Sequence, residues 1–129
     1  MGSRGPDTEP NGGVLVVEDD AGVRLLLQRV LQNAGYRVVV ASGPEEALEL
    51  VERGCVRVDL LVSDLVMPVM TGRALAERLA RYLPGLRTLL ISGYPDDNDP
   101  EGELPVAFLQ KPFTPLTLTR TVEAVLSAG

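Results

Sequence analysis

Short apolar runs alternate along the chain with longer segments in which apolar residues recur every three or four positions. A short apolar run is typical of a strand buried on both faces, and the longer spacing is typical of a helix packed on one side. The pattern predicts five strands, at residues 14–17, 38–40, 58–62, 88–91 and 106–109. It also predicts four helices, at residues 20–34, 42–53, 71–83 and 114–126.

Residues that favour helix starts stand at the expected boundaries. Asp20, Thr71 and Thr114 each precede a helical stretch, where a side-chain oxygen can accept a hydrogen bond from a free backbone N–H. Pro115 follows at the first helical position. Residues 42–45, Ser-Gly-Pro-Glu, read as a capping box in which Ser42 and Glu45 cap each other's backbone N–H groups.

Strands that alternate with helices of this length form parallel βαβ units. Because such crossovers are right-handed, we predict an α/β fold of the flavodoxin-like type. This fold is a three-layer sandwich with a five-stranded parallel sheet in the order 2-1-3-4-5. Residues 95–105 depart from the pattern, because they are rich in proline and acidic residues and have no apolar face. We therefore expect the helix between the fourth and fifth strands to be short, irregular or absent.

Length and composition fit one domain of 129 residues, of which 45% are hydrophobic. We expect this domain to occupy residues 13–129, and residues 1–12 to be a disordered leader or a cloning remnant. The net charge of −6 argues against direct nucleic-acid binding. No apolar run approaches the roughly 20 residues of a membrane span, so we expect no membrane contact. The single cysteine, Cys55, excludes an internal disulfide and fits a reducing cytoplasm.

Two features of the composition limit the chemistry. The chain has no histidine, which excludes Ser-His-Asp and Cys-His catalysis and any zinc site that needs imidazole. Of its 12 basic residues, Lys111 is the only lysine. A lone lysine arises by chance or marks a position that needs a compact point charge, which the planar guanidinium of arginine does not provide.

Polar residues follow the predicted strands at their carboxyl ends. Glu18 and Asp19 follow the first strand, Asp64 the third, Ser92 the fourth and Lys111 the fifth. Parallel strands bring these ends to one edge of the sheet. Packed carboxylates repel each other unless a hard cation lies among them, and Mg²⁺ commonly binds one or two carboxylates together with a phosphate. An aspartate in such a site can act as the nucleophile of phosphoryl transfer and form an aspartyl phosphate.

Four short motifs stand at these strand ends in a fixed order. They are residues 14–20, Asp64 with Met67-Pro68 and Gly72, residues 91–93, and residues 111–113. Each motif alone is weak, but together they resemble the receiver domain of two-component response regulators, from about Gly13 to the end of the chain. Residues 92–94 and 108–113 are further similar to the receivers at the carboxyl end of hybrid sensor histidine kinases.

The resemblance implies roles in phosphoryl transfer. Asp64 is the expected phosphoacceptor, and Lys111 is expected to pair with the phosphoryl group. Ser92 is expected to donate a hydrogen bond to a phosphoryl oxygen after transfer and to draw its loop inward. Phe108 occupies the aromatic switch position, although a buried core position is an equally good interpretation of this residue. The Lys111–Pro112 peptide bond is expected to be cis.

The resemblance also implies a magnesium site, for which Mn²⁺ could substitute. Asp19 and Asp64 are the expected direct ligands, Glu18 is expected to act mainly through water, and Val66 is expected to offer its backbone carbonyl. An isolated acidic triplet after a strand would more often be a solvated loop with a helix cap. Here Asp64 is expected opposite, which favours a metal site.

The implied partner is a histidine kinase or a histidine phosphotransfer domain, because this chain has no phosphohistidine of its own. The domain would catalyse its own phosphorylation and dephosphorylation, without independent turnover, and would switch the surface of the fourth and fifth strands. The first helix, with Arg24 and Arg29, is the expected docking element. In this family the helix expected at residues 95–105 is part of the usual dimerisation face. Because we expect that helix to be short, irregular or absent, we expect a monomer or a weak dimer that does not bind DNA. A single-domain regulator and one module of a hybrid kinase both stay open.

Three alternatives share the predicted fold or chemistry. A pseudo-receiver would serve as an interaction module without phosphorylation, but it would be expected to lack an acidic residue or the lysine. A hydrolase of the haloacid dehalogenase type would carry an Asp-x-Asp motif at the first strand, where this chain has Glu18-Asp19-Asp20. A flavodoxin-like flavin binder would need a phosphate-binding loop there, and these carboxylates would repel phosphate.

Overall fold

The computed structural model describes residues 13–54, 56–93 and 106–127, and strands and helices alternate along them as predicted. Their bounds are β1 (Gly13–Val17), α1 (Ala21–Asn33), β2 (Arg37–Ala41), α2 (Pro44–Glu52), β3 (Leu60–Asp64), α3 (Gly72–Ala80), β4 (Arg87–Ser92), β5 (Ala107–Gln110) and α4 (Pro115–Ser127). The leader expected at residues 1–12 and the irregular helix expected at residues 95–105 lie outside the described residues. Among the described helices, none has the length and apolar character needed to cross a bilayer.

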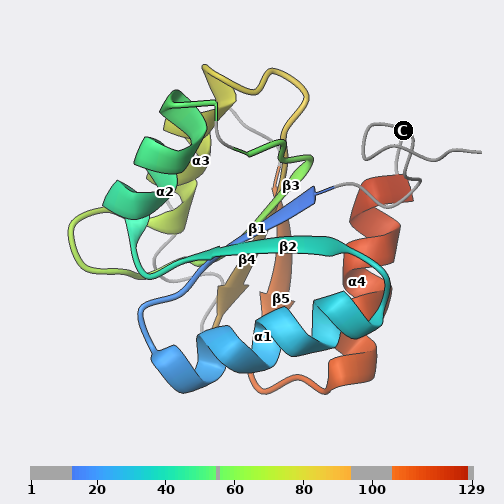
Figure 1. The fold of residues 1–129 in the computed structure, drawn as a ribbon. Coiled ribbons are helices and arrows are strands. Elements are labelled where there is room, and N and C mark those ends of the chain that lie inside the picture. Colours follow the sequence, from blue (N-terminus) through green and yellow to red (C-terminus); the bar gives the residue numbers. More distant parts are fainter. Residues whose placement is uncertain (1–12, 55, 94–105, 128–129) are drawn as a thin grey trace, which may run out of the picture.

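The strands form one sheet in the order β2-β1-β3-β4-β5, and every neighbouring pair is parallel. Helices α2 and α3 cover one face, and α1 and α4 cover the other (Figure 1). This arrangement confirms the predicted flavodoxin-like, three-layer fold. It also brings the carboxyl ends of the strands to one edge of the sheet.

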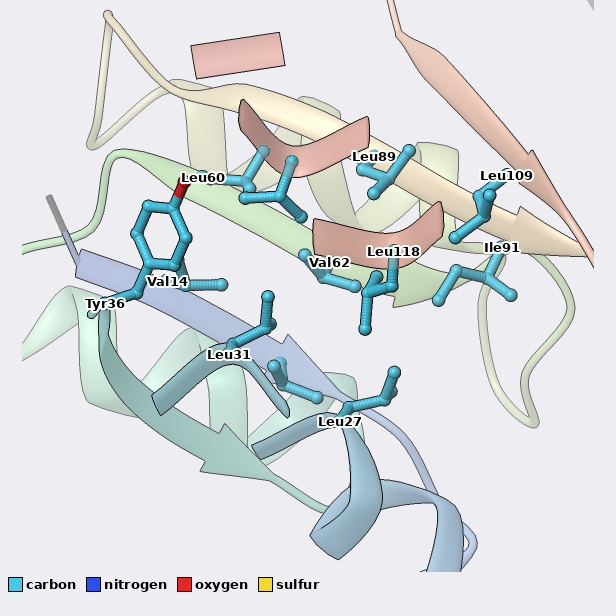
Figure 2. Packing of buried hydrophobic residues seen from close by; sticks show 12 residues of the cluster. Val14, Leu27, Leu31, Tyr36, Leu60, Val62, Leu89, Ile91, Leu109 and Leu118 are labelled. Atoms are coloured by element: carbon cyan, nitrogen blue, oxygen red, sulfur yellow. The ribbon is translucent and has the colours of Figure 1, made fainter. Parts of the chain in front are cut away.

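Alternate residues of the central strands serve two separate cores. Figure 2 shows the core on the α1 and α4 side, where Val14, Val62 and Leu89 of the sheet face Leu31 and Leu118 of the helices. The residues between them in the strands pack against α2 and α3; this second core includes Leu15, Val17, Leu61, Ala47 and Leu75. Because both faces are buried, these strands read in the sequence as continuous apolar runs.

The predicted caps of α1, α3 and α4 are confirmed. Asp20 Oδ1 accepts a hydrogen bond from the Val23 N–H at 3.0 Å. Thr71 caps α3 in the same way, and Thr114 accepts a hydrogen bond from a backbone N–H in the first turn of α4. The Lys111–Pro112 bond is cis, as expected. The caps act over three or four residues, which is why the sequence is sufficient to recognise them, whereas the cis bond was implied by the resemblance.

The predicted capping box of α2 is wrong by one residue. The N-cap is Gly43, which offers no side chain, and Pro44 begins the helix. Glu46, not Glu45, therefore occupies the third helical position, and its Oε1 accepts hydrogen bonds from the N–H (2.8 Å) and the hydroxyl (3.0 Å) of Ser42. Only one half of the capping box is present, because the Ser42 hydroxyl donates to Glu46 instead of accepting a helix N–H. The helix also starts one position later than the sequence motif suggests.

The third strand also differs from its predicted bounds. It begins at Leu60 and continues through Ser63 and Asp64, beyond the apolar run. Ser63 stays in register with Val17 of β1, and Asp64 with Ile91 of β4. Backbone pairing with two neighbours holds these polar residues in the strand. Asp64 is consequently part of a central strand rather than of the loop that follows it.

Candidate functional site

Three carboxylates converge at the carboxyl edge of the sheet. Glu18 and Asp19 follow β1, and Asp64 ends β3, its neighbour in the sheet. Oxygen atoms from the three side chains lie within 4.8 Å of one another. Glu18 is 3% exposed and Asp64 8% exposed, whereas Asp19 lies at the surface. The structure therefore brings together the acidic residues that the sequence placed on neighbouring strands.

The turn between β1 and α1 is held by several hydrogen bonds. The Glu18 N–H donates to the Ala41 carbonyl of β2 at 3.1 Å, which extends the strand pairing by one residue. The Asp20 N–H donates to Glu18 Oε2 at 3.0 Å. From the first turns of α1, Arg24 Nη1 donates to the Glu18 carbonyl at 2.8 Å. These contacts fix the backbone on both sides of Asp19.

Glu18 is an electrostatically unfavourable position for a charge. Its Oε2 accepts the Asp20 N–H, but its Oε1 is buried and has no hydrogen-bond partner in the described part of the chain. Burial is the largest cause that raises the pKa of Glu18, and the neighbouring Asp64 and Asp19 carboxyls raise it further. The Asp20 N–H opposes these effects, yet the pKa rises from 4.5 to about 8. In the absence of a cation, this site therefore favours a protonated Glu18 near neutral pH.

Lys111 supplies a positive charge on the other side of Asp64. Its Nζ lies 3.3 Å from Asp64 Oδ1, and its side chain is about half exposed. The Lys111 N–H donates to the Ser92 carbonyl at 2.9 Å, so the residue is attached to the end of β4. One lysine faces three carboxylates here, which leaves an excess of negative charge in a partly buried place.

The residues at this edge fit a hard divalent cation. Among the described residues, Glu18 Oε1 is buried without a hydrogen-bond partner, and Asp64 Oδ1 has only its ion pair with Lys111. A buried oxygen without a partner is costly unless something else satisfies it. Carboxylate oxygens are the donors that Mg²⁺ prefers. Val66 lies two residues after Asp64 with its side chain exposed and apolar, so only its backbone carbonyl could contribute.

The loop after β3 folds closely against the strand that carries Asp64. The Leu65 N–H donates to the Ile91 carbonyl at 2.9 Å, and the Gly72 N–H donates to the Leu65 carbonyl at 2.7 Å. A Cβ atom at Gly72 would overlap the Asp64 carbonyl oxygen. The sequence motif contained Gly72, but only the structure shows that its missing side chain permits this close approach. Ser63, which the sequence analysis did not select, donates its hydroxyl to the same Asp64 carbonyl at 2.9 Å.

Ser92 and Phe108 occupy different parts of this region. Ser92 is buried at the end of β4, one position beyond Ile91, which is the register partner of Asp64. Phe108 is in register with Leu90, two positions before the residue that pairs with Ser92. Its ring is 38% exposed, and Leu109 instead provides the buried side chain of β5. The interpretation of Phe108 as a buried core residue is therefore wrong, and the proposed switch role stays a prediction.

Comparisons with known proteins agree with this geometry. The family model of the response regulator receiver domain matches residues 14–123. The sensor kinase CckA of Brucella abortus is 37% identical over 123 residues, which are 93% of this chain but 13% of that kinase. The response regulator receiver protein CpdR of the same organism is 32% identical over 122 residues, which are 90% of this chain and 98% of CpdR.

Solved structures give the same result. A crystal structure of the receiver domain from the hybrid histidine kinase CckA has a TM-score of 0.76 and 36% identity, and the match covers 90% of this chain and all of that one. The chemotaxis protein CheY4 of Vibrio cholerae has a TM-score of 0.74 and 28% identity, with 89% and 98% of the two chains covered. The chain belongs to the family of response regulator receiver domains, the signalling modules of two-component systems.

Proposed function

We propose that this receiver domain accepts a phosphoryl group on Asp64 from a phosphohistidine of a histidine kinase or a histidine phosphotransfer domain. The observation that carries the proposal is the position of the Asp64 carboxylate. It ends a central strand, lies 3.3 Å from the chain's only lysine and faces two further carboxylates. A nucleophilic carboxylate between a cation and an acidic metal-binding cluster is an arrangement suited to phosphoryl transfer.

In the proposed reaction, an Asp64 carboxylate oxygen attacks the phosphorus atom of the phosphohistidine. The new bond is an acyl phosphate, the phosphorus–nitrogen bond breaks, and the imidazole of the partner leaves. Lys111 holds the negative charge of the phosphoryl oxygens, because its Nζ already lies beside Asp64. The pairing of Asp64 with Ile91 of β4, and of the preceding Ser63 with Val17 of β1, keeps the nucleophile in place.

Asp19, Asp64 and the Val66 carbonyl would hold Mg²⁺ or Mn²⁺ directly, and Glu18 would hold it mainly through water. When bound, the cation supplies neutralisation of the charge that moves with the phosphoryl group. The free Glu18 Oε1 is the atom of that residue best suited to this task, because Oε2 already accepts the Asp20 N–H.

Phosphorylation would be read out at the ends of β4 and β5. The phosphoryl group adds a charge of about −1.5 to −2 together with new acceptor oxygens. In this proposal the Ser92 hydroxyl donates to one of those oxygens, and Lys111 turns toward the others. The Lys111 N–H is bonded to the Ser92 carbonyl, so the two residues move as a unit. The half-exposed Phe108 ring on β5 would then change its position.

The partner would dock over α1 and the start of α4. Leu25 and Leu26 of α1 are 46% and 53% exposed, and Leu116 of α4 is also exposed. A groove of about 320 Å³ lies between these two helices, and Leu116 is part of its lining. Arg24 is turned to the Glu18 carbonyl, so the docking role expected for it passes to the exposed Arg29. We place this encounter in the cytoplasm, with the domain acting as a monomer or a weak dimer.

The other readings have less support. A pseudo-receiver is not favoured, because Glu18, Asp19, Asp64 and Lys111 are all present and converge. A hydrolase of the haloacid dehalogenase type would place its nucleophile at β1, whereas the lysine of this chain lies beside the aspartate of β3. The sequences on either side of this domain would show whether a kinase core accompanies it.

Intact mass spectrometry after incubation with Mg²⁺ and acetyl phosphate tests the proposal. Wild-type protein should gain one phosphoryl mass, and Asp64→Asn should gain none. Asp20→Asn is the matched control, because it removes a nearby carboxylate while asparagine still caps α1. A wild-type protein that takes up no phosphoryl group would refute the proposal, and equal uptake by Asp64→Asn would place the acceptor elsewhere.

A further inference from the structure

The side chain of Arg24 reaches back from α1 to the strand that carries the acidic cluster. Its Nη1 lies 2.8 Å from the carbonyl oxygen of Glu18, the residue that directly follows β1. The backbone N–H of Glu18 is also hydrogen-bonded, since it donates to the carbonyl of Ala41 in β2. The peptide group between Glu18 and Asp19 is therefore held by a charged donor from outside the turn.

Arg24 also acts electrostatically on the start of α2. The Arg24 guanidinium lies close enough to Glu46 to help lower its pKa, after the two larger contributions from the Ser42 N–H and hydroxyl. Ser42 follows Ala41, the residue that accepts the Glu18 N–H. The side chain of Arg24 is therefore directed back toward the β1–α1 turn, where its hydrogen bond is to the Glu18 carbonyl.

We infer that Arg24 is a positioning residue for the cation site, which fixes the peptide between Glu18 and Asp19 and thereby aims both carboxylates at Asp64. This inference rests on the cation site of the proposed function but not on phosphorylation itself. Carboxylates that repel each other would otherwise separate by rotation of this turn. Partners that orient metal ligands typically change metal affinity ten- to a hundredfold when they are removed.

The sign of the effect separates this role from a simple charge effect. If Arg24 acted only as a nearby positive charge, its removal would make the site more negative and would tighten Mg²⁺ binding. If it positions the turn, its removal weakens Mg²⁺ binding despite the more negative site. Arg24→Met keeps the length and the helix propensity of the side chain while it removes the charge and the donor. Arg78→Met is the matched control, because Arg78 is an exposed arginine of α3 that has no role in the proposed site or docking surface.

Isothermal titration calorimetry with Mg²⁺, in the absence of any phosphodonor, gives the Mg²⁺ dissociation constants of these variants. We expect Arg24→Met to weaken Mg²⁺ binding about tenfold and Arg78→Met to leave it unchanged. Arg24→Lys, which keeps the charge with a shorter reach, should fall between wild type and Arg24→Met. Equal or tighter binding by Arg24→Met would overturn the inference. If Arg24→Met does not fold, wild-type affinity in Arg24→Lys would overturn it, because the reach of the guanidinium to the Glu18 carbonyl would then not be needed.

Amide hydrogen exchange of the metal-free protein adds a readout that does not depend on the cation. In Arg24→Met, exchange should accelerate at the Glu18 and Asp20 amides, which the turn protects, and not at the core amide of Leu61. Equal acceleration at all three amides would indicate a general loss of stability and would contradict the inference. The two proposals can fail separately. If wild-type protein accepts no phosphoryl group but Arg24→Met still weakens Mg²⁺ binding, only the proposed function is refuted.

Discussion

Glu18 should make the metal-free protein less stable as the pH rises. Its pKa is raised from 4.5 to about 8 in the folded state, first by burial and then by Asp64. A raised pKa means that the folded state binds the proton more tightly than the unfolded state. The resulting stability is therefore fully present below pH 4.5 and is lost as the pH rises through about 8.

The Glu18→Gln variant isolates this contribution, because glutamine has a similar shape and cannot ionise. With the two pKa values above, linkage gives a loss of about 4 kcal/mol for wild type between about pH 5 and about pH 8.5. Glu18→Gln should not undergo this loss, so its stability relative to wild type should increase by the same amount. The chain has no histidine, so few other groups titrate in this interval.

Urea unfolding in EDTA, followed by far-ultraviolet circular dichroism, measures both proteins across this pH interval; the chain has no tryptophan for fluorescence. Glu77→Gln, at an exposed position of α3, is the control and should follow wild type. Saturating Mg²⁺ should close the gap between wild type and Glu18→Gln, because the cation offsets the charge. Parallel pH profiles for the two proteins would refute the reasoning.

Three further predictions concern the surroundings of Asp64. Lys111→Met removes the cation that lies 3.3 Å from Asp64, and phosphorylation by acetyl phosphate should slow roughly ten- to a hundredfold in a mass-spectrometric time course. Gly72→Ala places a methyl group against the Asp64 carbonyl, which should cost about 1–3 kcal/mol in urea unfolding and also slow phosphorylation. Leu61→Ala should cost about 2–5 kcal/mol yet leave Mg²⁺ affinity unchanged, because Leu61 lies in the core rather than at the site. A wild-type phosphorylation rate in Lys111→Met would contradict the first prediction, and wild-type stability of Gly72→Ala would contradict the second. Loss of Mg²⁺ binding by Leu61→Ala would contradict the third.

Much of the fold follows from local patterns in the sequence. The run from Val14 to Val17 is apolar at every position because both faces of β1 are buried, and this makes a central parallel strand easy to recognise. Asp20 and Thr71 act as caps through hydrogen bonds to residues three positions away, so their roles are visible without tertiary information. The convergence of Glu18 and Asp64 follows in turn from parallel neighbouring strands.

Other features depend on three-dimensional contacts that no local pattern contains. Ser63 and Asp64 belong to β3 because their backbones pair with β1 and β4, although their side chains end the apolar run. The contact of Arg24 with the Glu18 carbonyl depends on the direction that a long side chain takes across a turn. The aromatic ring of Phe108 suggests a buried core position, but whether it is buried depends on which face of β5 it occupies, and it is exposed. These are tertiary effects, and they concern the details of the site more than the fold.

The charge balance of the site connects its stability with its proposed function. Glu18, Asp19 and Asp64 outnumber Lys111. Within the described ranges, Glu18 Oε1 is buried without a hydrogen-bond partner, and Asp64 Oδ1 has only its ion pair with Lys111. The metal-free fold thus tolerates an unfavourable arrangement, which natural proteins retain mainly where function requires it. In the proposed cycle a cation reduces the excess negative charge and a phosphoryl group restores it. Lys111 is the charged group that can respond by moving, because it is half exposed, and its backbone bond to Ser92 makes the ends of β4 and β5 the elements that would follow.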